Sequence, residues 1–184
     1  MNTFKAIFDP TYFLSYFKIM TQIGIISDTH SYLDENVFKH FASCDEIWHI
    51  GDFGNKEVAE KLKEFKPLKG VYGNIDEADI REEFPLIMSF RCEEVQVLMT
   101  HIGGYPPKYN AASKPLIRQN KPQLFLSGHS HILKVMYDDV FNCLHINPGA
   151  AGKHGWHAVR TLVRIKIDGS IIKNCEVIEL GSRG

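Results

Sequence analysis

Short apolar runs recur along the chain, and each ends at a glycine or at small polar or ionisable residues. The runs are QIGIIS (22–27), EIWHI (46–50), LKGVY (68–72), VQVLM (95–99), QLFLS (123–127) and CLHI (143–146). A bounded apolar run of this length is typical of a buried strand. The chain is therefore expected to form sheets whose strands end in chemically active side chains.

Helical patterns lie between the first of these runs. Residues 34–42 and 55–65 carry apolar side chains at helical spacing, and Asn55 is a plausible N-cap for the second segment. In the last third, residues 132–140 and 141–147 could pair around Asp138-Asp139, and 158–167 could form a hairpin with 171–180. Alternating strands and helices followed by antiparallel strands predict an α/β (α+β) chain in which two sheets pack together with helices outside.

The domain organisation follows from length and from an unusual beginning. A chain of 184 residues, 44% hydrophobic and 23% charged, suits one globular domain, expected at 20–184. Residues 1–19 are crowded with aromatic side chains, and Asp9-Pro10 interrupts any signal-peptide core. This extension is either an amphipathic docking segment or lies upstream of a true start at Met20; the second reading is slightly favoured.

Charge and cysteine content limit the partners and the compartment. The net charge of −1 gives no global basic field for nucleic acid or an anionic membrane. The four cysteines are far apart in sequence, which suits reduced thiols and a cytoplasmic location. No apolar run approaches the roughly 20 residues of a membrane span.

Seven polar side chains follow the apolar runs and are expected to meet at one edge of the fold, because ligands of open α/β sheets bind beyond the carboxyl ends of the strands. They are Asp28, His30, Asp52, Asn74, His101, His129 and His131. Each alone has an ordinary explanation as a cap, turn or packing residue. His129 and His131, two residues apart, point to the same side of an extended backbone.

The chemistry of the set favours metal ions. Carboxylate, imidazole and amide ligands suit zinc, manganese, iron, cobalt or nickel. Seven ligands exceed the needs of one ion, whereas two ions sharing one carboxylate would use them all. Such two-metal sites clamp the attacking and leaving oxygens of a phosphoryl displacement.

The order of the motifs resembles that of the calcineurin-like metallophosphoesterase superfamily. The motifs are Asp28-Thr29-His30, Gly51-Asp52, Gly73-Asn74, His101 and Gly128-His129-Ser130-His131, and Asn147-Pro148-Gly149 extends the likeness. Compact length and the sequence GNID (73–76) are similar to the small single-domain phosphodiesterase branch. The resemblance implies a four-layer architecture, a two-sheet β-sandwich flanked by helices.

The resemblance also implies roles for these residues. One divalent ion would be held by Asp28, His30, Asp52 and His131, and the other by Asp52, Asn74, His101 and His129, with Asp52 bridging. The ions could be manganese, nickel, cobalt, iron or zinc. A metal-bridging hydroxide would attack the phosphorus of a small phosphodiester, with Asp52, Asn74 and His101 as catalytic residues.

Some positions depart from the superfamily pattern or stay open. Many related phosphomonoesterases carry histidine after the motif asparagine, where this chain has Ile75; Ala150 replaces a frequent serine, and IGGYP (102–106) follows His101. Asp76 is either a partner for a ligating histidine or a local cap. His154 and His157 either line the substrate rim or belong to a solvated loop, and the loop is favoured. His40, His49 and His145 are expected to pack in helices or strands.

Other functions remain in competition. The superfamily includes a protein-binding scaffold in the retromer cargo-sorting complex, a reading that predicts eroded ligands, and none is eroded here. A phosphomonoesterase or protein phosphatase is disfavoured by Ile75. Nuclease action has no support from a basic or aromatic groove. Whether copies of the chain form a homo-oligomer is left open.

Overall fold

The computed structural model describes residues 20–184, and the expectations for residues 1–19 lie outside this range. A first sheet has the strand order β12-β11-β1-β2-β3. Its strands are β1 (Thr21–Ile26), β2 (Glu46–His49), β3 (Leu68–Gly70), β11 (Val159–Asp168) and β12 (Ile171–Ser182). The strands β1, β2 and β3 are parallel, while β11 is antiparallel to both β1 and β12. The carboxyl ends of three strands therefore meet at one edge.

A second sheet repeats this plan with the order β4-β5-β8-β10-β9. Its strands are β4 (Ile87–Cys92), β5 (Val95–Thr100), β8 (Leu124–Leu126), β9 (Lys134–Asp138) and β10 (Cys143–Asn147). Here β5, β8 and β10 are parallel, and antiparallel β4 and β9 close the two edges. The parallel strands fill one side of the first sheet and the centre of the second, and the loops that leave their carboxyl ends can converge.

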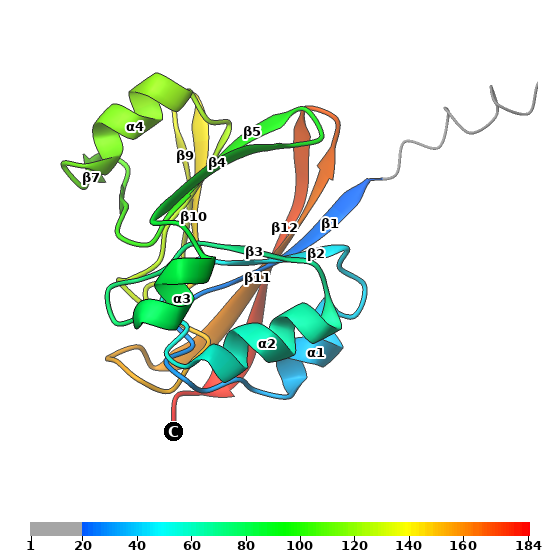
Figure 1. The fold of residues 1–184 in the computed structure, drawn as a ribbon. Helices are drawn as coiled ribbons and strands as arrows, with labels where there is room; N and C mark the ends of the chain where they lie inside the picture. Colours follow the sequence, from blue (N-terminus) through cyan, green and yellow to red (C-terminus); the bar gives the residue numbers. More distant parts are fainter. Residues whose placement is uncertain (1–19) are drawn as a thin grey trace, which may run out of the picture.

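Four helices and a small hairpin complete the fold. The helices are α1 (Asn36–Phe41), α2 (Lys56–Phe65), α3 (Ala78–Glu83) and α4 (Ser113–Asn120), and the hairpin consists of β6 (Gly104–Tyr105) and β7 (Lys108–Tyr109). Figure 1 shows α1 and α2 together on one side of the molecule and α4 on the opposite side. The helices therefore lie outside the pair of sheets.

Three hydrophobic clusters account for this layering. The largest joins side chains of both sheets, such as Ile25, Trp48 and Leu126, so it fills the space between them. A second cluster packs α1, α2 and α3 against the first sheet through residues such as Phe41 and Leu62. A third, around Leu98, Ile117, Phe125 and Cys143, packs α4 on the second sheet. The order of helix, sheet, sheet, helix confirms the predicted two-sheet sandwich with helices outside.

The sequence patterns located most elements, and the structure adds the sheet to which the last hairpin belongs. The predicted pairing of β9 with β10 and the hairpin of β11 with β12 are both present, and Asn55 caps α2 by accepting a hydrogen bond from the Val58 N–H at 3.3 Å. The last hairpin, however, does not join the second sheet. It joins the first sheet beside β1, because the apolar side chains of β11, including Val163 and Ile165, face the same inter-sheet core as Ile23 and Ile25.

Two further properties bear on the sequence expectations. Within residues 20–184, no helix combines the length and apolar character needed to cross a bilayer. Cys44, Cys92 and Cys143 are buried free thiols. Burial raises the pKa of Cys44 and Cys92 to about 11 and that of Cys143 to about 12, so these thiols remain protonated and unreactive near neutral pH.

We predict that a chain starting at Met20 folds on its own, because the three clusters are built from residues that pack against one another from Ile23 onward. Circular dichroism and thermal unfolding of Met20–Gly184 should match those of the full chain. Aggregation, or a melting temperature lowered by more than about 2–4 °C, which corresponds to roughly 1 kcal/mol in a domain of this size, would show that residues 1–19 stabilise the fold.

Candidate metal centre

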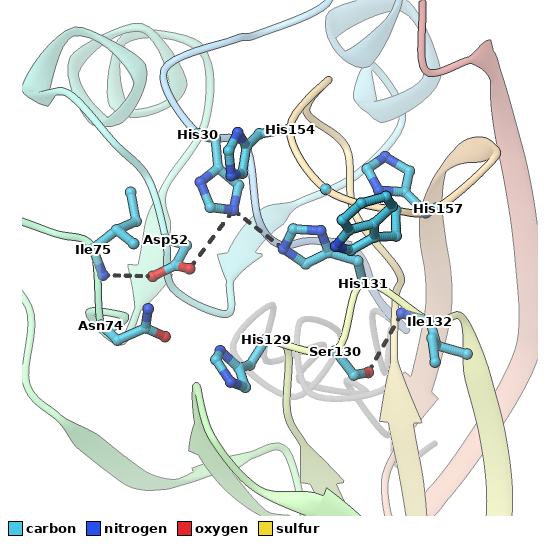
Figure 2. A pocket seen from close by; sticks show the side chains of 12 residues that line it. His30, Asp52, Asn74, Ile75, His129, Ser130, His131, Ile132, His154 and His157 are labelled. Carbon is cyan, nitrogen blue, oxygen red and sulfur yellow. Dashed lines mark hydrogen bonds and ion pairs between the residues drawn. The ribbon is translucent and has the colours of Figure 1, made fainter.

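All seven predicted ligands lie at one edge of the fold, in loops that follow strands of both sheets. Asp28 and His30 follow β1, Asp52 follows β2, and Asn74 follows β3. From the second sheet, His101 follows β5, and His129 and His131 follow β8. Figure 2 shows side chains from both groups around one cleft. The structure therefore brings together the residues that the sequence placed in separate motifs.

The first group contains Asp28, His30 and His131, whose candidate ligand atoms lie within 4.8 Å of one another. His30 Nε2 and His131 Nε2 are 3.2 Å apart, and His131 Nε2 is 3.2 Å from Asp28 Oδ1. Asp28 Oδ1 is buried without a hydrogen-bond partner in residues 20–184. A buried carboxylate oxygen facing imidazole nitrogens suits a bound cation, because an unpaired buried charge is otherwise unfavourable.

The second group contains Asp52, His101 and His129, whose candidate ligand atoms also lie within 4.8 Å of one another. Asn74 adjoins this group through its contact with His101. His101 Nδ1 lies 2.8 Å from the Ile50 carbonyl and donates to it, because a carbonyl can only accept. His101 Nε2 then faces two oxygens, Asp52 Oδ2 at 3.2 Å and Asn74 Oδ1 at 3.1 Å. The lone pair of His101 Nε2 would repel these two oxygens at such distances. A metal cation, or a second proton on His101, would remove the repulsion.

Asp52 connects the two groups. Its Oδ2 lies 3.2 Å from His101 Nε2 and 3.7 Å from His30 Nε2, while its Oδ1 accepts a hydrogen bond from the Ile75 N–H at 3.1 Å. The dashed lines in Figure 2 mark its contacts with Ile75 and His30. Asp28 Oδ1 also lies 3.9 Å from His101 Nε2, so both carboxylates lie between the groups, and Asp52 makes the shorter contact across them.

The electrostatics of the centre match this arrangement. Burial alone would lower the pKa of His101, but hydrogen bonding to Asp52 and the charges of Asp28 and Asp52 outweigh it, so the pKa is raised. Burial would raise the pKa of Asp52, but His101, the Ile75 N–H and His30 lower it overall. The raised pKa of His101 reflects the negative charge of two nearby carboxylates, and the lowered pKa of Asp52 reflects the groups that stabilise its carboxylate.

The backbone at the ligands adopts the left-handed region that residues other than glycine rarely enter. The φ angles are 54° at Asp28, 46° at His30, 56° at Asp52, 65° at His129 and 56° at His131. Such conformations are unfavourable and cluster at functional sites. Here they turn the chain sharply at the strand ends.

Hydrogen bonds from residues outside the ligand set hold these turns. Asp28 Oδ2 accepts from Ser27 Oγ at 2.6 Å and from the His129 N–H at 3.2 Å, which ties the two sheets together. Asn147 Nδ2 donates to the Gly128 carbonyl at 2.8 Å and to Ser130 Oγ at 3.1 Å. Asn147 thus stabilises the loop that carries His129 and His131.

His49 packs in β2 as expected, and it also holds the motif loops, which sequence reasoning missed. Its ring stacks on Phe53 at 3.6 Å between centroids. Its Nδ1 accepts from the Gly51 N–H at 3.2 Å, and its Nε2 lies 3.0 Å from Thr29 Oγ1. Burial lowers the pKa of His49 well below its usual value, so it stays neutral. Its position one residue before Ile50-Gly51-Asp52 was a signal that could have indicated this role.

The sequence left the roles of Asp76, His154 and His157 undecided, and the structure shows what each residue contacts. Asp76 accepts hydrogen bonds from the Gly54 N–H at 2.9 Å and the Gly73 N–H at 2.7 Å, so its contacts are those of a local cap joining two loops. The ring of His154 lies 4.8 Å from that of His30, and the ring of His157 lies 5.3 Å from that of His131. Both histidines line the cleft, whereas the sequence favoured a solvated loop away from it.

The cleft itself measures about 580 Å³ and has both polar and apolar walls. Ile75, Ile132 and Trp156 line it beside the histidines, with exposed fractions of 42%, 60% and 101%. The centre is therefore open to a small molecule, and part of its rim is apolar.

The four-layer sandwich and its cluster of carboxylates and imidazoles define a metallophosphoesterase class of protein. The sequence model of the calcineurin-like phosphoesterase superfamily domain matches residues 21–170, so the chain belongs to this family. A probable metallophosphoesterase of Methanocaldococcus jannaschii is 30% identical over 135 residues, which cover 70% of this chain and 67% of that protein.

Solved structures show the same fold. An archaeal phosphodiesterase superposes with a TM-score of 0.70 at 22% identity and covers 87% of this chain and 100% of its own. Vps29 of Chaetomium thermophilum superposes with a TM-score of 0.70 at 14% identity, over 89% of this chain and 100% of its own. At these identities the structures share the fold with this chain, and their activities are not carried over by the likeness.

We predict that Gly73→Ala weakens metal binding without unfolding the protein. A Cβ at position 73 would overlap Asp52 Oδ1 and the Asp52 backbone, so the carboxylate must move. A displaced ligand support typically lowers metal affinity by roughly 10–100-fold. Calorimetric titration with Mn²⁺ measures the affinity, and circular dichroism of the metal-free variant is the folding control. Unchanged affinity would show that Asp52 does not bind the ion.

Proposed function

We propose that the protein is a dinuclear metal-dependent phosphodiesterase whose catalytic domain is residues 20–184. The single observation that carries this proposal is the set of facing acceptor atoms. Asp28 Oδ1 has no hydrogen-bond partner in the described chain, and His101 Nε2 faces two oxygens at 3.1 and 3.2 Å. Bound divalent cations would satisfy all of these atoms at once.

In this proposal Asp28, His30, Asp52 and His131 hold one divalent ion, and Asp52, Asn74, His101 and His129 hold the other. The nitrogen and oxygen ligands suit manganese, nickel, cobalt, iron or zinc. When bound, the ions supply the Lewis acidity that activates a water and neutralises phosphate oxygens. The chain's own contribution is to orient these ligands through the Ile50 carbonyl, the Ile75 N–H and Ser27.

The residue after Asn74 supports a diester as the substrate. Ile75 lines the cleft and is 42% exposed, so an aliphatic side chain lies where related monoesterases place a histidine. Isoleucine neither donates a proton to a leaving group nor neutralises the second charge of a monoester. The apolar rim, including Ile132 and Trp156, instead suits a substrate with a second organic group.

The size of the cleft, the net charge and the free thiols bear on the substrate and on the cellular compartment. A cleft of about 580 Å³ suits a small diester. The net charge of −1 gives no support to nucleic acid as the substrate. Free thiols at Cys44, Cys92 and Cys143 suit a reducing, cytoplasmic environment.

A protein-binding scaffold is the second candidate function. Vps29 structures share the fold, and that of Chaetomium thermophilum has a TM-score of 0.70. The intact ligand set and its strained, hydrogen-bonded loops favour catalysis, since a scaffold has no need of them. Metal binding and turnover together distinguish the two functions.

We predict two metal ions per chain, both dependent on Asp52. Asp52→Asn should impair both sites, because an amide lacks the charge that one carboxylate shares between the two groups. His30→Ala should weaken mainly one site, since His30 belongs to the first group only. Elemental analysis and calorimetric titration with Mn²⁺, Ni²⁺ and Co²⁺ give the stoichiometries.

The second measurement is the hydrolysis of bis(4-nitrophenyl) phosphate by the protein after these metals are supplied. A wild-type protein that stays metal-free and inactive after these metals are supplied would contradict the enzyme proposal and favour the scaffold. Equal loss of both ions in His30→Ala would contradict the assignment of ligands to two groups.

We also predict a preference for diesters over monoesters that Ile75→His reduces. A charged histidine at position 75 would neutralise part of the second negative charge of a monoester, whereas help to the leaving group would act on both substrates alike. The ratio of kcat/KM for 4-nitrophenyl phosphate to that for methyl 4-nitrophenyl phosphate should rise by at least about tenfold, the usual effect of one hydrogen bond to a charged group. Ile75→Leu is the matched control, because it changes shape without adding a donor.

The two substrates share one leaving group, so their comparison isolates the charge and the second ester arm. A wild-type enzyme that prefers the monoester would contradict this prediction. The donor would then have to come from another residue of the cleft, with His154 and His157 as the first candidates.

A further inference from the structure

A second pocket, with a volume of about 380 Å³, adjoins the metal centre. Two of the predicted ligands, Asn74 and His101, form part of its wall, and Asn74 also lines the large cleft. The pocket therefore lies within reach of an ester arm whose phosphorus is held beside Asn74. Much of the remaining wall of this apolar pocket consists of hydrocarbon side chains, those of Tyr72, Leu86, Ile87, Ile102, Ala112 and Leu116.

Three of these apolar side chains are exposed. The exposed fractions are 52% for Leu86, 37% for Ile87 and 40% for Ile102. Leu86 and Ile87 lie at the start of β4, whereas Ile102 lies beyond the end of β5, so separate segments bring them to one cavity. Single exposed apolar side chains are common on protein surfaces, but a group of them around one cavity indicates a binding site. A ligand that covers them would gain from removing apolar surface from water.

The polar side chains in the wall are bonded within the protein. Ser113 Oγ donates to the Ile102 carbonyl at 3.2 Å. Asn110 Oδ1 accepts a hydrogen bond from the Ala112 N–H at 2.7 Å. The hydroxyl proton of Ser113 and the amide oxygen of Asn110 are thus directed to the protein itself. A hydrocarbon loses nothing in such a pocket, whereas a polar group that gives up its water without gaining a partner is unfavourable.

The positive charge of Arg81 lies beside the loop that carries Asn74. Its Nε donates to the Asp76 carbonyl at 2.6 Å and its Nη2 donates to the Asn74 carbonyl at 3.2 Å. Its guanidinium carbon lies 4.9 Å from the centre of the Tyr72 ring. These contacts hold the guanidinium at the part of the pocket that borders the metal centre. The charge is therefore placed to favour the phosphate of a substrate, and the apolar residues are placed to favour its arm.

We propose that the apolar pocket binds one ester arm of the diester, and that this arm is an uncharged alkyl chain. Leu86, Ile87 and Ile102 contact the chain, while the predicted metal ligands hold the phosphate. The substrate class is then a phosphodiester with one alkyl arm. This inference rests on the proposed phosphodiesterase function.

The test compares two diesters that both release 4-nitrophenolate, hexyl 4-nitrophenyl phosphate and methyl 4-nitrophenyl phosphate. Burying one CH₂ group favours binding by roughly fourfold, and the hexyl arm has several more of these groups than the methyl arm. The wild-type kcat/KM should therefore be at least about tenfold higher for the hexyl diester. Equal values for the two diesters would overturn the proposal.

Substitutions of Leu86 locate this preference in the pocket. Leu86→Asn replaces the hydrocarbon by an amide of similar size, and it should lower the ratio of the hexyl to the methyl kcat/KM by at least about fourfold, the effect of one buried CH₂ group. Leu86→Met keeps an apolar side chain and should keep the ratio. Val140→Asn is the matched control, because Val140 is 84% exposed and lies outside the pocket. A ratio that Leu86→Asn leaves unchanged would overturn the proposal.

Binding can also be measured in the wild-type protein without turnover. In the presence of Zn²⁺, the methyl NMR signals of Leu86 should shift on addition of hexylphosphonate and stay in place with methylphosphonate. The same shift with both compounds would overturn the proposal. Signals that change with protein concentration alone, and not with hexylphosphonate, would show that a second copy of the chain covers the pocket, and would overturn it as well.

This second readout separates the two proposals. A wild-type protein that cleaves neither diester would overturn the phosphodiesterase function, and the NMR titration would still decide the apolar pocket. If the Leu86 signals do not move with hexylphosphonate, the proposal for the apolar pocket fails even when the enzyme is active.

Discussion

The position of one carboxylate, that of Asp52, is the constraint on which the rest of the centre depends. One of its oxygens is held by the Ile75 N–H, and the other faces the imidazoles of His101 and His30 from different sheets. For this to happen, the carboxyl ends of both parallel strand sets must open at the same edge. The two sheets achieve this because each contains three adjacent parallel strands, β1-β2-β3 in the first sheet and β5-β8-β10 in the second. The inter-sheet core then fixes the distance between the two loop sets.

This geometry is achieved at the expense of local stability. A left-handed conformation costs roughly 1–2 kcal/mol for an ordinary residue, and Asp28, His30, Asp52, His129 and His131 all adopt it. Their summed strain is comparable to the whole stability of a typical domain, about 5–15 kcal/mol. Hydrogen bonds from Ser27, His49, Asp76 and Asn147 to these loops offset part of it. A ligand that binds only the folded loops would offset more.

Much of this could be predicted from the sequence, and the limits have physical causes. Strand ends marked by Asp28, Asp52 and His101 were predictable, because apolar runs and the residues that stop them are local signals. The edge strand β4 was not predicted, because its exposed and half-buried residues, such as Met88 and Phe90, give no clean apolar run. The association of β11 with β1 could not be predicted either, since it depends on contacts more than a hundred residues apart.

Ile75 and Ile102 show how one metal centre can be given a particular selectivity. Each follows a predicted ligand directly, Asn74 and His101, and each is about two-fifths exposed, at 42% and 40%. Both side chains lie beside the centre, Ile75 in the large cleft and Ile102 in a smaller pocket that shares His129, Ser130 and Ile132 with it. Replacing polar groups by aliphatic ones at such positions removes proton donors and adds apolar contact area without disturbing the ligands. In the proposed phosphodiesterase, the motifs therefore set the chemistry of the centre, and the residues that immediately follow them set the choice of ester.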